Sequence, residues 1–236
     1  MQEIKLFGFG YHILYFCARK IKISLRMDET ARIIAKKLLE INAIKLNVEH
    51  PFIWASGWRS PIYCDNRLSL SYPEVRTFIK KQLAQTIRLQ FKGVQAIAGV
   101  ATAGIPQGAL VADVLEIPFI YIRSKPKDHG MENMIEGKIT PGQKVVVVED
   151  LVSTGGSSLK AVEALKASGF LVLGMVSVFT YGFPVAEANF ARENVKLISL
   201  SDYSALVEEA LRLNYVNEEQ IANLKNWREN PSTWGI

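Results

Sequence analysis

Cysteine and histidine are scarce in this 236-residue chain, which contains two cysteines and three histidines. Cys17 and Cys64 cannot form the disulfide framework of a small secreted domain, nor a four-ligand structural zinc site. We therefore expect a reducing, cytoplasmic compartment. Internal repeats, low-complexity tracts and proline- or serine-rich linkers are also absent. With 49% hydrophobic and 22% charged residues, the composition is that of one ordinary globular domain.

A membrane span is not expected either. Residues 167–186 carry no charge and are numerous enough to cross a bilayer. However, three glycines and Pro184 interrupt this stretch, and its β-branched and aromatic residues favour a strand. We interpret it as a buried strand with turns at both ends, so no membrane partner is predicted.

Positive charge is concentrated at the N-terminus. The chain has a net charge of +5, and residues 1–26 contribute +4 because five lysines and arginines oppose only Glu3. The other 210 residues carry only +1, so the pI near 9.1 does not indicate a nucleic-acid partner. The apolar run over 7–16 lacks the n-region and cleavage site of a signal peptide. We interpret residues 1–26 as an extension outside the core, with Met27 as the natural start.

Apolar strands alternating with helices predict an α/β fold, with a parallel sheet flanked by helices. We expect strands over residues 94–99, 118–122, 144–149, 170–180 and 195–200, and helices over 105–115, 155–167 and 185–192. The core is expected at about 94–201, between a smaller N-terminal part at about 27–70 and C-terminal helices over 203–230. Asp28 is expected to cap the first helix, and Pro73 to begin a second one.

The segment over residues 145–158 has the strongest functional pattern. Four valines precede Glu149 and Asp150, and a loop follows that consists of Leu151, Val152, Ser153, Thr154, Gly155, Gly156 and Ser157. Open α/β sheets bind ligands at the carboxyl ends of their strands. Backbone N–H groups at the start of the next helix form an anion cradle, and glycines let a phosphate approach it closely.

The two acids before this cradle would repel a phosphate, so they must face another group. Sugar hydroxyls, or a magnesium ion bridging to a polyphosphate, would satisfy them. The alternative is an ordinary strand-to-helix turn with a capping serine or threonine. A Walker A loop is excluded because no Gly-Lys-Ser/Thr follows at the required spacing, and a Rossmann G-x-G-x-x-G is absent from this segment.

This pattern resembles the phosphoribosyl pyrophosphate motif of type I phosphoribosyltransferases. The resemblance implies that Glu149 and Asp150 hold the 2′- and 3′-hydroxyls of ribose, while the loop as far as Ser157 wraps the 5′-phosphate. It also implies the type I phosphoribosyltransferase core, a parallel sheet flanked by helices, with a small N-terminal hood at about 27–70 that holds the base. The motif is shared by enzymes that use different bases.

Two other segments are similar to those of orotate phosphoribosyltransferases. A cationic loop, 123–130, matches the family's catalytic loop, with Arg123, Lys127 and His129 at the matching positions. Alone, such a run of cations would usually be a solvated surface. The aromatic segment over 52–63 resembles the family's hood near orotate. The resemblance runs in order from about Met27 to the C-terminus, within a single domain over 27–236.

The resemblance implies an enzyme that transfers ribose 5-phosphate to orotate in pyrimidine biosynthesis and requires Mg²⁺, without a dedicated protein metal site. Lys127, His129 and Asp150 are the expected catalytic residues, and Ser153 is the expected orotate contact. The family also implies a homodimer in which the loop from Arg123 to His129 acts in the neighbouring subunit. A purine phosphoribosyltransferase and a non-catalytic phosphoribosyl-pyrophosphate-sensing regulator remain alternatives.

The sequence departs from the best-known branch of the family at four positions. That branch has cations where this chain has Ala55, Ala103, Ser124 and Tyr181. These differences remove positive charge near the expected pyrophosphate and orotate positions. They leave the two acids, the phosphate cradle and the Arg-Lys-His set intact, so the expected reaction is unchanged.

Overall fold

The computed structural model describes residues 27–54, 56–125 and 134–235. The N-terminal extension over 1–26, together with Ala55, Lys127 and His129, lies outside the described residues. The prediction that the extension is separate from the core therefore stays a prediction.

A six-stranded sheet forms the core, in the order β10-β9-β8-β5-β6-β7. Its strands are β5 (Ala96–Val100), β6 (Phe119–Ile122), β7 (Ile135–Glu136), β8 (Lys144–Val152), β9 (Leu171–Thr180) and β10 (Leu197–Asp202). Every neighbouring pair is parallel except β6 with β7, which is antiparallel. The parallel sheet predicted from the apolar runs is thus confirmed, with one short antiparallel strand added at its edge.

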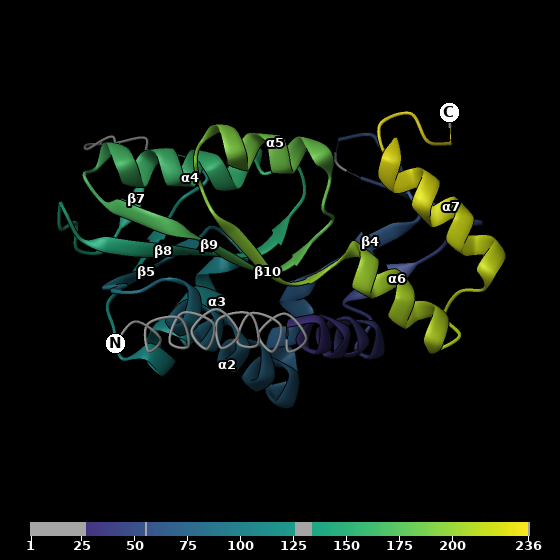
Figure 1. The fold of residues 1–236 in the computed structure, drawn as a ribbon, viewed down its shortest axis with the longest axis horizontal. Helices are drawn as coiled ribbons and strands as arrows, with labels where there is room; N and C mark the ends of the chain where they lie inside the picture. The colour runs from purple at the N-terminus through teal and green to yellow at the C-terminus, as the bar shows by residue number, and fades with distance from the viewer. Residues whose placement is uncertain (1–26, 55, 126–133, 236) are drawn as a thin grey trace, which may run out of the picture.

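Helices cover both faces of this sheet (Figure 1). On one face lie α4 (Gly156–Ala167) and α5 (Pro184–Arg192), and on the other lie α2 (Pro73–Gln90) and α3 (Gly104–Leu115). The valines of β8 divide between the two layers, because successive side chains of a strand point to opposite faces. Val145 and Val147 join the core under α4 and α5, whereas Val146 and Val148 join the core that includes α2 and α3.

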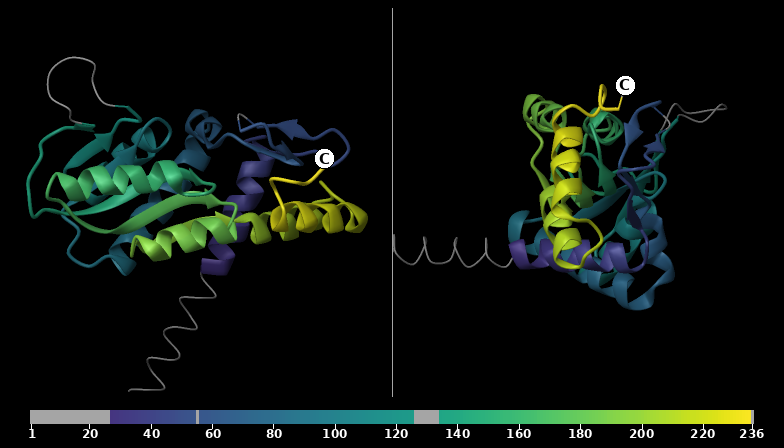
Figure 2. Two further views of the ribbon diagram at one scale, coloured as in Figure 1. Left: turned by 90° about the horizontal axis from the view of Figure 1, so that it is seen from above. Right: turned by 90° about the vertical axis from the view of Figure 1, so that its right-hand side faces the viewer.

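The hood and the C-terminal helices lie together at one end of the sheet (Figure 2). The hood contains two antiparallel pairs, β1 (Ile44–Leu46) with β4 (Ile62–Cys64) and β2 (Phe52–Ile53) with β3 (Arg59–Ser60), followed by the 3₁₀ helix η1 (Asn66–Ser71). After β10 come α6 (Tyr203–Arg212) and α7 (Glu218–Glu229). Trp227 of α7 is fully buried and donates from Nε1 to the carbonyl of Arg59, 3.2 Å away. The C-terminus therefore holds the hood against the core.

Three details differ from the predictions. Met27 and Asp28 are both already helical in the helix over 27–40, so Asp28 is not its N-cap. Strand β8 continues to Val152 instead of ending at Glu149, because β9 keeps pairing with it as far as Val152 with Thr180. Strand β7 was not expected, since two residues carry no periodic signal. No helix within the described ranges is long and apolar enough to cross a membrane.

Helix α2 offers a matched test of the core. Leu83 is fully buried, while Leu89 on the same helix is 50% exposed. Leu83→Ala should lower the free energy of unfolding by about 2–5 kcal/mol, because it removes buried methyl groups and leaves a cavity. Leu89→Ala should change it by less than about 0.5 kcal/mol. Equal losses in urea denaturation of the two variants would show that α2 does not pack as described.

Candidate active site

Strand β8 brings Glu149 and Asp150 to the carboxyl edge of the sheet. Glu149 is buried, with 6% of its surface exposed. Its Oε2 accepts a hydrogen bond from Ser158 Oγ at 3.1 Å, and its Oε1 accepts one from the backbone N–H of Asp150 at 3.1 Å. The first carboxyl group is therefore held from two sides, by its own strand and by the first turn of α4.

Burial raises the pKa of Glu149 well above its ordinary value, and the neighbouring charge of Asp150 raises it further. Burial also raises the pKa of Asp150, while the hydrogen bond from Glu149 acts in the opposite direction. Burial and the short distance between the two carboxyl groups therefore disfavour ionisation of both at the same time. A ligand with hydroxyl groups would offer hydrogen-bond donors to both carboxyl groups.

The loop after the acids has the conformation of an anion cradle. Gly155 has a φ of +80° and forms the N-cap of α4, whose first turn begins at Gly156. No described side chain caps this helix, so its first N–H groups are available to a ligand. Asn189 of α5 supports the loop by donating to the carbonyl of Thr154 at 3.0 Å.

Accessibility differs along the loop. Gly156 and Ser157 are exposed, while Ser153 and Thr154 are half-buried. Val152 is fully buried in the core under α4, and its carbonyl accepts a hydrogen bond from Thr180 Oγ1 at 3.1 Å. The exposed part of the loop is thus the part at the N-terminus of α4.

A pocket of about 340 Å³ joins three distant parts of the chain. Its lining comprises the motif residues Glu149, Asp150, Leu151 and Ser157, the loop Ala101, Thr102 and Ala103, and the hood residues Cys64, Asp65 and Arg67. The peptide between Ala101 and Thr102 is cis. The predicted acids therefore share one cavity with Ala103, a position at which the best-known branch of the family has a cation.

Close packing of α3 brings the loop over 101–103 to this place. Gly104 begins α3, and a Cβ there would lie 2.5 Å from the carbonyl oxygen of Val148 and 3.4 Å from Glu149 Oε1. Any side chain would push the helix start away from β8. The glycine thus permits the close approach that closes this side of the pocket.

The hood residues of the pocket were not predicted as site residues. Cys64, Asp65 and Arg67 do not belong to any of the motifs on which the predicted site rests. These last two form an ion pair, with 2.6 Å between Arg67 Nε and Asp65 Oδ1. The only sequence signal for them is the polar Asp-Asn-Arg run directly after a predicted strand.

The cationic loop is described only at its base. Arg123 follows β6, and its backbone N–H donates to the carbonyl of Met134 at 2.8 Å. Its Nη1 lies 3.8 Å from Glu136 Oε1 on β7. The pairing of β6 with β7 therefore brings the two ends of the loop together. Lys127 and His129 are outside the described residues, so their predicted roles stay predictions.

Tyr181 lies in an aromatic cluster beside the hood. Its ring centroid is 5.1 Å from that of Trp54, 5.4 Å from Phe183 and 5.8 Å from Trp227. Burial raises the pKa of its hydroxyl well above the ordinary value, so this side chain is neutral. At Tyr181, where the best-known branch has a cation, this chain therefore has an uncharged side chain within an aromatic cluster.

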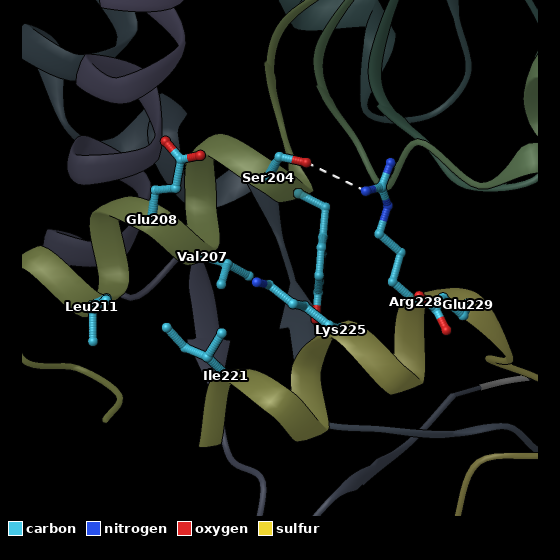
Figure 3. A pocket seen from close by; sticks show the side chains of 9 residues that line it. Ser204, Val207, Glu208, Leu211, Ile221, Lys225, Arg228 and Glu229 are labelled. Atoms are coloured by element: carbon cyan, nitrogen blue, oxygen red, sulfur yellow. Dashed lines mark hydrogen bonds between the residues drawn. The ribbon is translucent and has the colours of Figure 1, made fainter. Parts of the chain in front are cut away.

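A larger pocket of about 440 Å³ lies between α6 and α7. Figure 3 shows its apolar residues, such as Val207 and Ile221, together with the charged Glu208 and Lys225. None of the motif residues lines it. The chemistry therefore favours the smaller pocket at the end of β8 as the active site.

Comparison with known proteins agrees with this geometry. Residues 72–198 match the family model of the phosphoribosyl transferase domain. The central sheet, the paired acids and the cradle thus define a phosphoribosyltransferase fold and site. More specifically, the chain belongs to the orotate phosphoribosyltransferase family, a group of pentosyltransferases.

Relatives in sequence and in structure support this membership. The chain is 58% identical to the orotate phosphoribosyltransferase of Porphyromonas gingivalis over 210 residues, which are 89% of this chain and 100% of the relative. It is 59% identical to that of Cytophaga hutchinsonii over 85% of this chain and 96% of the relative. The crystal structure of orotate phosphoribosyltransferase from Aeropyrum pernix superposes with a TM-score of 0.68 at 30% identity, covering 78% of this chain and 99% of that one.

The buried carboxyl pair predicts how stability depends on pH. Glu149 ionises near 4.5 in the unfolded chain but at a raised pKa in the folded protein. As pH rises from about 5 to 8, the unfolded state releases this proton first, so the folded state loses stability, by about 1.4 kcal/mol for each unit of raised pKa. Glu149→Gln should therefore become progressively more stable than wild type over this range.

The measurement is the free energy of unfolding in urea at several pH values. Glu163→Gln, on the exposed face of α4, is the control and should follow the wild-type pH dependence. If Glu149→Gln also follows it, burial does not raise the pKa of Glu149 as described.

The cradle offers two adjacent glycines for comparison. A Cβ at Gly155 would lie 2.7 Å from Phe190 Cε2 in a left-handed conformation, whereas a Cβ at Gly156 would meet only Thr154 Oγ1, at 4.0 Å. Gly155→Ala should lower the free energy of unfolding by about 1–3 kcal/mol. Gly156→Ala adds the same methyl group and should not destabilise the protein. Indistinguishable midpoints of thermal unfolding would contradict the described loop.

Proposed function

We propose that this chain transfers ribose 5-phosphate from phosphoribosyl pyrophosphate to N1 of orotate, giving orotidine 5′-monophosphate and pyrophosphate. The observation that carries the proposal is the common pocket of Glu149, Asp150 and the N-terminus of α4. A single ligand with two vicinal hydroxyls and a phosphate satisfies both features at once. The printed names of the sequence relatives support orotate as the base.

In this reaction Glu149 and Asp150 accept hydrogen bonds from the ribose hydroxyls, and the cradle as far as Ser157 binds the 5′-phosphate. The bond from C1 of ribose to the pyrophosphate oxygen breaks through an oxocarbenium-like state, so positive charge develops on the ribose. Asp150, the less buried of the two acids, is the one that faces this charge. Ser153 contacts orotate through its hydroxyl or its N–H group.

The leaving pyrophosphate gains negative charge, and the positive charges of the cationic loop stabilise it. Arg123, Lys127 and His129 stabilise the leaving group, and removing one such contact typically costs about 2.7–4 kcal/mol. His129 can in addition donate a proton to a pyrophosphate oxygen. We propose that the protein is a homodimer and that this loop acts on the neighbouring subunit, where it also excludes water from the reactive state.

Mg²⁺ is the proposed cofactor. Within the described ranges, no group of three or more histidine, cysteine, aspartate or glutamate side chains forms a protein cage for a metal. The two adjacent carboxylates suit an ion that keeps several waters and is carried mainly by substrate phosphates. When bound, the ion would neutralise and orient the pyrophosphate, and Glu149 and Asp150 would be the residues that hold it. The low cysteine content supports a cytoplasmic location.

Purine phosphoribosyltransferases are the nearest rivals, since adenine phosphoribosyltransferase from Leishmania donovani also superposes, with a TM-score of 0.56. Release of pyrophosphate should be measured with orotate, uracil, adenine, hypoxanthine and guanine. We expect turnover with orotate only. Turnover with a purine would replace the proposed substrate, and no turnover with any base would favour the non-catalytic regulator.

Mixed dimers test the shared active site. Lys127→Ala damages the loop and Asp150→Asn damages the acid pair, so each homodimer alone should be nearly inactive. A mixed dimer has one site with both parts intact. Activity should return to about a quarter of wild type if exchange is statistical and the sites are independent. If mass spectrometry confirms exchange and no activity returns, the loop acts within its own subunit.

A further inference from the structure

A buried hydrogen-bond chain connects the hood to Asp150. Asn66, the first residue of η1, is 1% exposed. Its Nδ2 donates to the backbone carbonyl of Asp150 at 2.8 Å, which joins residues 84 positions apart in the sequence. The roles proposed above do not use this contact, although it touches the peptide of a catalytic acid.

The sheet itself leaves the carbonyl of Asp150 in need of a partner. Strand β5 pairs with β8 only as far as Gly99 with Val148, so Asp150 lies beyond the end of this ladder. Strand β9 pairs with Leu151 on the other side of β8, but it does not offer a partner to this carbonyl in the register of the two strands. A backbone carbonyl that lacks a partner away from water costs free energy. Asn66 takes the place of the missing strand at this point.

The orientation of the Asn66 amide is determined by its neighbours. Cys64 donates from Sγ to Asn66 Oδ1 over 3.3 Å, and burial raises the pKa of this thiol, so it retains its proton. Oδ1 of Asn66 accepts a hydrogen bond from this thiol, so Nδ2, the donor side of the amide, faces the carbonyl of Asp150. Both sides of the amide are thus engaged, one in the hood and one in the core.

A second layer holds the backbone of Asn66. Ser69 Oγ donates to the carbonyl of Asn66 at 2.6 Å, and Gln107 Nε2 on α3 donates to Ser69 Oγ at 3.2 Å. All three residues are at most 1% exposed. Buried and connected polar groups of this kind are rigid, because each has few alternative partners.

We propose that Asn66 is a positioning residue, which holds the peptide of Asp150 and thereby directs its carboxylate toward the ribose hydroxyls. The inference rests on the proposed function for the identity of the ligand, phosphoribosyl pyrophosphate. The hood would then have a second role besides holding the base, because its residue Asn66 aligns Asp150 of the core.

A double-mutant cycle on ligand binding tests this role. The affinity for phosphoribosyl pyrophosphate is measured by calorimetry for wild type, Asn66→Ala, Asp150→Asn and the double variant. Each single change should weaken binding about tenfold, since small misplacements of a positioning group have effects of this order. The double variant should bind no more than about twofold more weakly than Asp150→Asn, because the misdirected carboxylate is already absent.

Two further variants separate positioning from stability. Asn66→Ser retains a polar group but is too short to span Cys64 and Asp150, so it should repeat the effect of Asn66→Ala with less destabilisation. Ser201→Ala removes a buried hydrogen bond of 2.8 Å to the carbonyl of Ala31, and it should lower the midpoint of thermal unfolding without weakening binding.

The proposal is overturned if the Asn66 variants bind phosphoribosyl pyrophosphate as tightly as Ser201→Ala does. It is also overturned if the loss of affinity in the double variant equals the product of the losses in Asn66→Ala and Asp150→Asn, because the two residues would then act independently. Failure of the proposed function looks different. In that case wild type shows no turnover with orotate, whereas the binding cycle is measured without any base.

Discussion

Two carboxyl groups with little access to water are the constraint on which the site depends. Glu149 is buried and Asp150 lies beside it, directly after four consecutive and fully buried valines of β8. Desolvation disfavours the charge on both groups, and their proximity adds to this cost. The surrounding structure compensates with donors, from Ser158 and from the backbone of β8. We propose that a ligand with two hydroxyl groups, such as a ribose, completes the compensation.

The elements around this pair each supply one part of the site. Helix α4 contributes its uncapped N–H groups, and α3 starts close enough to bring the loop over 101–103 to the same cavity. The hood adds Cys64, Asp65 and Arg67 from a segment more than 80 residues earlier. Close to the hood, Tyr181 belongs to an aromatic cluster instead of providing a cation. At this position the described structure therefore has apolar surface in place of a positive charge.

The sequence was most informative where a pattern is local. Four consecutive valines followed by two acids and a glycine-rich loop specify a buried strand and a helix start, and both are found there, beside a pocket that the two acids line. The continuation of β8 to Val152 was not predictable in this way, because it depends on pairing with β9. Likewise, Asn66 meets Asp150 only through the placement of the hood on the core, for which a short polar run gives no periodic signal. Contacts between segments that are distant in the sequence depend on tertiary packing. The sequence therefore did not predict the pairing of β8 with β9 beyond Glu149 or the contact of Asn66 with Asp150.

We propose that Glu149 and Asp150 bind the hydroxyl groups of ribose. Calorimetric titration with ribose 5-phosphate and with 2-deoxyribose 5-phosphate tests it directly, since both ligands present the same phosphate to the cradle. Wild type should bind ribose 5-phosphate about tenfold more tightly than 2-deoxyribose 5-phosphate, because with the deoxy sugar a buried acceptor loses its hydrogen-bond partner. Equal affinity for the two sugars would contradict the account, because the acid pair would then face some other group.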